Sequence, residues 1–140
     1  MPDGTIEREL RIDARPETVF AYLTEPEKLT PWWPRDAKTD PVAEGQYRLD
    51  FDEEHVAVGE YVEVIPNERL VFTWAFEGQD LPVTKVEFTL TPEGGGTILR
   101  MVHAGLPQPA VDSHAEGWDL YLPRLAVAAA GGTNPPATKT

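Results

Sequence analysis

The sequence contains no cysteine among its 140 residues and a single serine, Ser113. Without thiols the chain has neither a disulfide framework, nor a thiolate nucleophile, nor a zinc site built on thiolates. A hydrolytic triad is not supported either, because Ser113 and the adjacent His114 are expected to face different ways on a helix. No catalytic grouping therefore stands out, and we expect a binding protein rather than an enzyme.

Basic residues are also scarce, with 12 Lys and Arg against 24 Asp and Glu, a net charge of -12 and a pI near 4.5. Such a surface repels phosphate backbones and anionic lipids, so neither nucleic acid nor a membrane is an expected partner. No apolar run approaches the roughly 20 residues of a membrane span. The N-terminus MPDGTIEREL lacks a basic region followed by an apolar run. A soluble, cytoplasmic protein is expected.

The three histidines are far apart in the sequence and form neither a His-x-His nor a His-x-x-x-His pair. Most zinc sites use ligands at such close spacings, so we expect no metal and no cofactor. His55 lies in the acidic turn DEEH and is predicted to be solvated. His103 and His114 fall on apolar faces of a predicted strand and a predicted helix, where they could point into one cavity or be satisfied core or rim histidines.

Alternation of apolar and polar residues predicts six strands. The predicted strands cover residues 5–13, 45–52, 56–65, 69–77, 83–91 and 97–104. Turn residues such as Pro66-Asn67-Glu68 and the glycines 94–96 separate the later strands, which indicates antiparallel hairpins with short connections. The first strand is expected to join the same sheet.

Two short helices are expected after the first strand. Pro16 suits the first helical position of one of them. Residues 24–27, Thr-Glu-Pro-Glu, have the spacing of a capping box and would begin the other, which Pro31 ends.

A longer helix is predicted over residues 110–130, where apolar residues recur at helical spacing. Pro123 predicts a bend within it, and Gly131 suits its C-terminal cap. Residues 1–130 are thus expected to form one domain, followed by a flexible tail at 131–140. The inward stripe comprises Val111, His114, Ala115, Trp118, Leu122, Leu125, Ala126 and Ala129.

This order of elements predicts an α+β helix-grip fold, in which a curved six-stranded antiparallel sheet wraps around the long C-terminal helix. The chain resembles the SRPBCC (START-like, helix-grip) superfamily, in the branch named after the activator of the heat-shock-protein-90 ATPase. The resemblance implies an apolar cavity between sheet and helix, where many members bind small lipophilic molecules, but it carries over no catalytic motif. The matching stretches are ARPETVFAYL (14–23), Trp32-Trp33, GEY (59–61), PNERLVFTW (66–74), and HAEGW (114–118) with Leu122 and Leu125.

The stretch TPWWP, residues 30–34, holds two large rings on a loop stiffened by proline. Tryptophan combines an apolar body with one N–H donor, so it often lies half-buried. We predict that Trp32 or Trp33 forms part of the cavity mouth, while the other anchors the loop on Phe20 or Leu23.

Trp74 and Trp118 are predicted to face inward, where core and pocket wall can be the same surface. Gly117 is expected to permit a close approach of helix to sheet, and Glu60, if buried at a bulge, could serve as an acid or base. The residues predicted to contact a ligand are Trp32, Trp33, Phe51, Phe72, Trp74, Phe88, Met101, His103, His114 and Trp118.

Binding of a small lipophilic molecule is the function that these features favour. One alternative is a protein-interaction module that contacts a chaperone, as the family name suggests. Another is a cavity enzyme such as a cyclase, dehydratase or hydrolase, which two converging ionisable groups would favour. A homodimer is compatible with all three.

Overall fold

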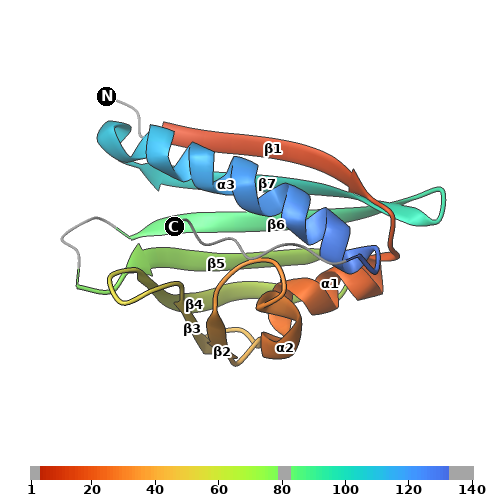
Figure 1. Ribbon diagram of the computed structural model, residues 1–140, viewed down its shortest axis with the longest axis horizontal. Coiled ribbons are helices and arrows are strands. Elements are labelled where there is room, and N and C mark those ends of the chain that lie inside the picture. The colour runs from red at the N-terminus through yellow and green to blue at the C-terminus, as the bar shows by residue number, and fades with distance from the viewer. Residues whose placement is uncertain (1–3, 79–82, 133–140) are drawn as a thin grey trace.

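The computed structural model describes residues 4–78 and 83–132, which form one curved antiparallel sheet and three helices (Figure 1). The strands are β1 (Gly4–Ile12), β2 (Asp36–Thr39), β3 (Gln46–Asp50), β4 (Val56–Ile65), β5 (Arg69–Phe76), β6 (Thr84–Glu93) and β7 (Gly96–Leu106). The helices are α1 (Pro16–Thr24), α2 (Pro26–Leu29) and α3 (Gln108–Ala129).

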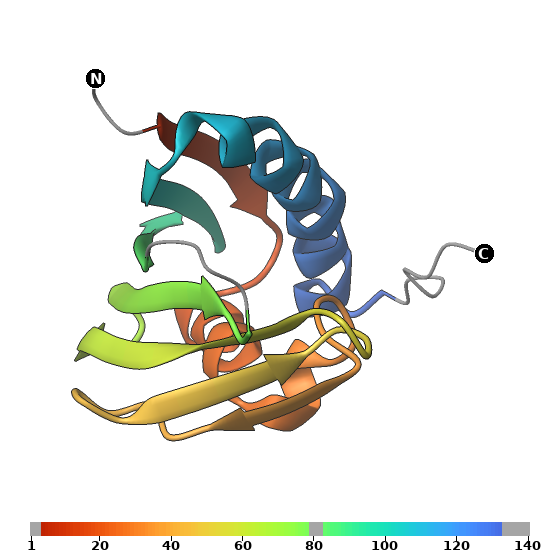
Figure 2. The same cartoon turned by 90° about the vertical axis from the view of Figure 1, so that its left-hand side faces the viewer.

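The sheet has the strand order β1-β7-β6-β5-β4-β3-β2. Its strands curve, and α3 lies along the side that the curvature encloses (Figure 2). α1 and α2 connect β1 to β2, so the chain passes from one edge of the sheet to the other between its first two strands. The expected helix-grip fold is confirmed.

The predicted number of strands is wrong, because the sheet has seven and not six. The additional strand is β2, which pairs with β3 at the edge of the sheet. Its four residues, DAKT, bury only Ala37, so they are too few and too polar to show a period of two. The other six strands begin and end within two residues of their predicted ends.

The junction between α1 and α2 differs from the predicted capping box. Thr24 is the last residue of α1, and its hydroxyl donates to the carbonyl of Phe20 at 2.9 Å. Glu25 occupies the N-cap position of α2, with an extended backbone and no side-chain cap. Because Pro26 disfavours helical dihedrals in the residue before it, one helix ends here and a new one begins.

The predicted long helix is confirmed as α3, which begins at Gln108 because Pro109 fits within its first turn. The helix continues past Pro123 to Ala129. The predicted flexible tail lies, from residue 133 onward, outside the described residues. No helix in residues 4–78 and 83–132 has the length and apolarity required to cross a bilayer.

Three neighbouring strands, β5, β6 and β7, supply a broad wall of buried side chains. Burial of this wall supplies much of the driving force for folding, since apolar area removed from water stabilises the native state. The wall comprises Leu70, Phe72, Trp74, Val86, Phe88, Leu90, Leu99, Met101 and His103.

Candidate functional site

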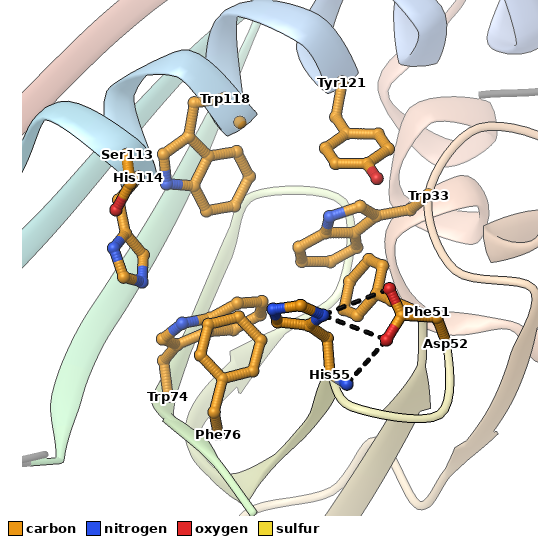
Figure 3. Close-up of a pocket in the computed structure, with 11 residues that line it drawn as sticks. Trp33, Phe51, Asp52, His55, Trp74, Phe76, Ser113, His114, Trp118 and Tyr121 are labelled. Atoms are coloured by element: carbon orange, nitrogen blue, oxygen red, sulfur yellow. Dashed lines mark hydrogen bonds and ion pairs between the residues drawn. The ribbon is translucent and has the colours of Figure 1, made fainter. Parts of the chain in front are cut away.

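A pocket of about 300 Å³ opens between α3 and the concave side of the sheet (Figure 3). The loop after α2, the β3–β4 connection, β5 and α3 all contribute to its walls. The lining residues are Trp33, Phe51, Asp52, His55, Trp74, Phe76, Ser113, His114, Gly117, Trp118 and Tyr121.

The two adjacent tryptophans of the loop have different environments. Trp32 is fully buried (0% exposed), its indole N–H donates to the carbonyl of Tyr22 at 2.9 Å, and its own carbonyl accepts from Arg124 Nε at 3.3 Å. Trp33 is 8% exposed and lines the pocket. Trp32 therefore fixes the loop between α1 and α3, and Trp33 presents its ring to the pocket.

Trp33 is the centre of an aromatic cluster. Its ring stacks on Trp32 at a centroid distance of 4.8 Å and on Trp74 at 5.6 Å, with interplanar angles of 12° and 8°. Trp118 lies against it at 5.4 Å with a tilt of 42°. Offset and tilted arrangements of this kind favour aromatic pairs beyond their apolar burial, so the pocket wall is built of mutually supporting rings.

His103 lies behind this wall and holds it in place. The indole N–H of Trp118 donates to His103 Nδ1 at 3.0 Å, and since Nδ1 accepts there, Nε2 carries the proton of the neutral ring. Nε2 donates to Thr84 Oγ1 at 2.7 Å, and that hydroxyl donates to the carbonyl of Trp74 at 3.2 Å. Burial, and to a smaller extent the neighbouring His114, lowers the pKa of His103 to about 3. His103 is thus a satisfied core histidine.

His114 faces the pocket from α3. Its Nδ1 donates to the carbonyl of Ala110 at 2.9 Å, and its ring meets that of His103 edge-on, with centroids 5.3 Å apart. Ser113 Oγ donates to the same carbonyl at 3.2 Å and also lines the pocket. Ser113 and His114 point about 100° apart around α3, as expected of adjacent helical residues, but the pocket is wide enough for both to line it.

His55 and Asp52 form a polar pair at the rim, and both were missed by the sequence reasoning as pocket residues. The carboxylate of Asp52 accepts from the peptide N–H groups of Glu54 and His55, each at 2.8 Å, and from His55 Nδ1 at 2.9 Å. The N–H of Glu54, and next the His55 ring, lower the pKa of Asp52. The turn is indeed exposed, yet it places the imidazole against Phe76 at 5.7 Å.

Half of the predicted ligand contacts line this pocket and half do not. Trp33, Phe51, Trp74, His114 and Trp118 are brought together around it. The other predicted residues are buried in the core away from its lining, because the pocket occupies only part of the space between sheet and helix. These are Trp32, Phe72, Phe88, Met101 and His103.

The predicted role of Gly117 is wrong. A Cβ placed on Gly117 would meet no atom within 4 Å, so the glycine borders the pocket rather than a tight contact with the sheet. A close approach of a different kind occurs at Gly59, between the neighbouring strands β4 and β5, where a Cβ would lie 2.2 Å from the carbonyl oxygen of Thr73. Glu60 beside it is exposed, which removes it as a buried acid or base.

A recognisable signal exists for some missed residues. Ser113, Gly117 and Tyr121 recur every four residues and form the row beside His114 and Trp118 on α3. Within the two described segments, no three or more His, Asp or Glu side chains gather closely enough to hold a metal ion.

Comparison with known proteins agrees with this architecture. Residues 13–130 match the family model "Activator of Hsp90 ATPase homolog 1-like protein". A search of curated proteins finds no match.

Solved structures of similar proteins are numerous. CalU16 from Micromonospora echinospora is 27% identical over 92% of this chain and 78% of its own, with a TM-score of 0.78. DynU16, a protein in the dynemicin biosynthetic locus, is 26% identical with a TM-score of 0.83, and the match covers 94% of this chain but 49% of DynU16. The Aha1 dimer from Colwellia psychrerythraea is 21% identical over 94% of this chain and 99% of its own, with a TM-score of 0.82, and shows the shared fold. The chain belongs to the family of activator of Hsp90 ATPase homolog 1-like proteins.

Proposed function

We propose that the protein binds a small, lipophilic, aromatic molecule in the pocket between α3 and the sheet. The observation that carries this proposal is a hollow of about 300 Å³ walled by aromatic rings from four separate parts of the chain. Its volume is at the lower end of the roughly 300–1,000 Å³ typical of small-molecule sites. A ligand of one or two fused rings fits that size.

The chemistry of the walls favours such a ligand. Trp33, Trp74 and Trp118 offer ring faces and edges against which a flat apolar molecule can stack. Polar groups are few and lie at one side and the rim, as expected where they orient a ligand rather than supply most of its binding energy. The similarity to DynU16, a protein of a biosynthetic locus, is compatible with a small-molecule ligand.

A second candidate, proton-transfer catalysis on the bound molecule, is favoured by one observation. Asp52 holds His55 through Nδ1 at 2.9 Å, which leaves Nε2 of the neutral ring able to accept a proton. Conversion of a bound compound, followed by mass spectrometry and lost in His55→Gln, would favour this candidate over binding alone.

The binding proposal is tested by filling the pocket from α3. A Cβ on Gly117 would meet no atom within 4 Å beyond its own stretch of helix, so Gly117→Leu extends a side chain from the wall of the pocket into open space. Glu116→Leu places the same side chain on the exposed side of the helix. Naphthalene should raise the melting temperature of the wild type and of Glu116→Leu, since binding to the native state alone stabilises it. Gly117→Leu should show no such shift.

Two results would contradict the proposal. One is an equal shift in Gly117→Leu, which would place the binding elsewhere. The other is the lack of any shift in the wild type with naphthalene and similar lipophiles, after which the chaperone-interaction module becomes the better alternative.

A further inference from the structure

One pocket residue carries a buried hydrogen-bond donor that the protein leaves unused. Trp74 is 5% exposed, and its Nε1 has no hydrogen-bond partner in the described part of the chain. Among the buried side-chain nitrogen and oxygen atoms of residues 4–78 and 83–132, it is the one without a partner. Buried polar groups are nearly always paired, so an indole N–H without an acceptor requires an explanation.

Two other indoles of the same cluster show the usual arrangement. Trp32 Nε1 donates to the carbonyl of Tyr22 at 2.9 Å, and Trp118 Nε1 donates to His103 Nδ1 at 3.0 Å. The fold thus supplies protein acceptors for both of these indoles, although Trp118 also lines the pocket. Trp74 lines the pocket as well but lacks a protein acceptor among the described residues, so a ligand atom can take that place.

A hydrogen-bond acceptor lies at the same end of the pocket. Because His114 Nδ1 donates to the carbonyl of Ala110 at 2.9 Å, Nε2 of the neutral imidazole has a free lone pair. Trp74 and His114 line the main pocket together, and both also border a recess of about 10 Å³ beside Thr84. Figure 3 shows the imidazole of His114 at the end of the pocket toward which the nitrogen-bearing side of the Trp74 indole is turned.

We propose that this pair, Trp74 Nε1 as donor and His114 Nε2 as acceptor, recognises the hydroxyl group of a phenol-type ligand. The ligand oxygen accepts from Trp74, and the hydroxyl proton is donated to His114. This inference rests on the proposed function, since it names the chemical class that the aromatic pocket selects.

Other polar groups satisfy the pair less well. A ketone or ether oxygen accepts from Trp74 but has no proton for His114, and an ammonium group has no lone pair for Trp74. A carboxylate would bring negative charge into a protein of net charge -12, beside the carboxylate of Asp52 at the rim. A neutral hydroxyl both donates and accepts at a single atom, which is the combination that the two side chains offer.

The test compares 2-naphthol with naphthalene and 2-methoxynaphthalene by calorimetric titration. Transfer from water alone favours naphthalene over the more polar naphthol. The proposal instead expects 2-naphthol to bind the wild type about tenfold more tightly than naphthalene, as one buried donor gains its acceptor. The methoxy compound, which accepts but does not donate, should bind more weakly than 2-naphthol.

Variants assign the effect to the pair. His114→Phe and Trp74→Phe keep a ring at each position but remove the acceptor or the donor, so each should abolish the preference for 2-naphthol over naphthalene when the two affinities are compared within the same variant. Glu116→Phe, which adds the same ring to the exposed side of α3, should retain it. His114→Phe alone suffices if Trp74→Phe fails to fold.

The outcomes separate this inference from the proposal on which it rests. Equal affinity for 2-naphthol and naphthalene, or a preference that survives in His114→Phe, would overturn the hydroxyl inference and leave the aromatic pocket standing. Failure of all three compounds to bind the wild type would overturn both.

Discussion

The indole N–H of Trp118 donates to Nδ1 of His103 at 3.0 Å, and this bond connects the pocket wall to a histidine that lies behind it. Trp118 comes from α3 and His103 from β7, so the bond also joins the helix to the sheet. Protonation of His103 would place a hydrogen on Nδ1, which would then repel the indole donor. The pocket wall therefore depends on a neutral histidine.

Stability is predicted to fall as the pH is lowered below about 6.5. The pKa of His103 is about 3 in the folded protein but about 6.5 in the unfolded chain, so between these values the unfolded state binds the additional proton. The contribution of His103 is fully present above pH 6.5 and is lost progressively toward pH 3. At pH 5.5 the free energy of unfolding should be about 1.4 kcal/mol lower than at a pH well above 6.5.

The measurement is urea unfolding at pH 7.5 and 5.5, compared with His103→Gln. A glutamine can accept from Trp118 and donate to Thr84 without titrating, so this variant should lose much less stability between the two pH values. Equal losses in both proteins would show that His103 does not cause the dependence. The ring of His114 contacts that of His103 and can itself take a proton. His114→Gln therefore shows how much of the pH dependence comes from His114.

Trp118→Phe is predicted to destabilise the fold by about 1–3 kcal/mol, because it leaves the buried Nδ1 of His103 without its donor. It should also raise the pKa of His103, since Nδ1 becomes free to take a proton. Nuclear magnetic resonance titration of the His103 ring measures this second effect. A histidine curve identical to that of the wild type would contradict the role assigned to the hydrogen bond.

Gly117→Ala is predicted to stabilise the protein by about 1 kcal/mol. Alanine has the higher helix propensity by about that amount, and the added methyl group meets no atom within 4 Å. Thermal unfolding of the variant checks this result. A lower melting temperature would restore the close-packing role that the sequence suggested.

The sequence predicted the fold better than the site, for physical reasons. Burial on one face of a strand imposes a period of two, so residues such as Phe72, Phe88 and Met101 were correctly placed inward. That periodicity identifies which side chains face the interior but not where the interior is left unfilled. These three residues therefore contact protein atoms, while the pocket lies nearer the β3–β4 turn.

Turn residues are the second reason why the residues that line the pocket were predicted incompletely. The acidic turn DEEH was correctly predicted to be exposed, but exposure does not exclude a place at a pocket rim. His55 reaches the pocket because Asp52 holds its backbone and its ring together, a local arrangement without periodicity. Gly117 shows a related difficulty. A glycine in a helix is compatible both with a tight contact against a neighbouring element and with an open space, so the sequence does not distinguish the two.

The adjacent tryptophans 32 and 33 are predicted to separate loop anchoring from pocket formation. Trp32→Leu removes a fully buried ring (0% exposed) together with its hydrogen bond to Tyr22, so it should destabilise the protein by about 3 kcal/mol or more. Trp33→Leu removes a ring that is 8% exposed and partly faces the pocket, so it should cost less stability. The larger effect of Trp33→Leu should be on the affinity for naphthalene. The affinity should fall because Trp74, which forms part of the pocket wall, loses the ring that stacks on it. Urea unfolding and calorimetric titration of both variants measure the two effects, and equal losses of stability and affinity in the two proteins would contradict this separation of roles.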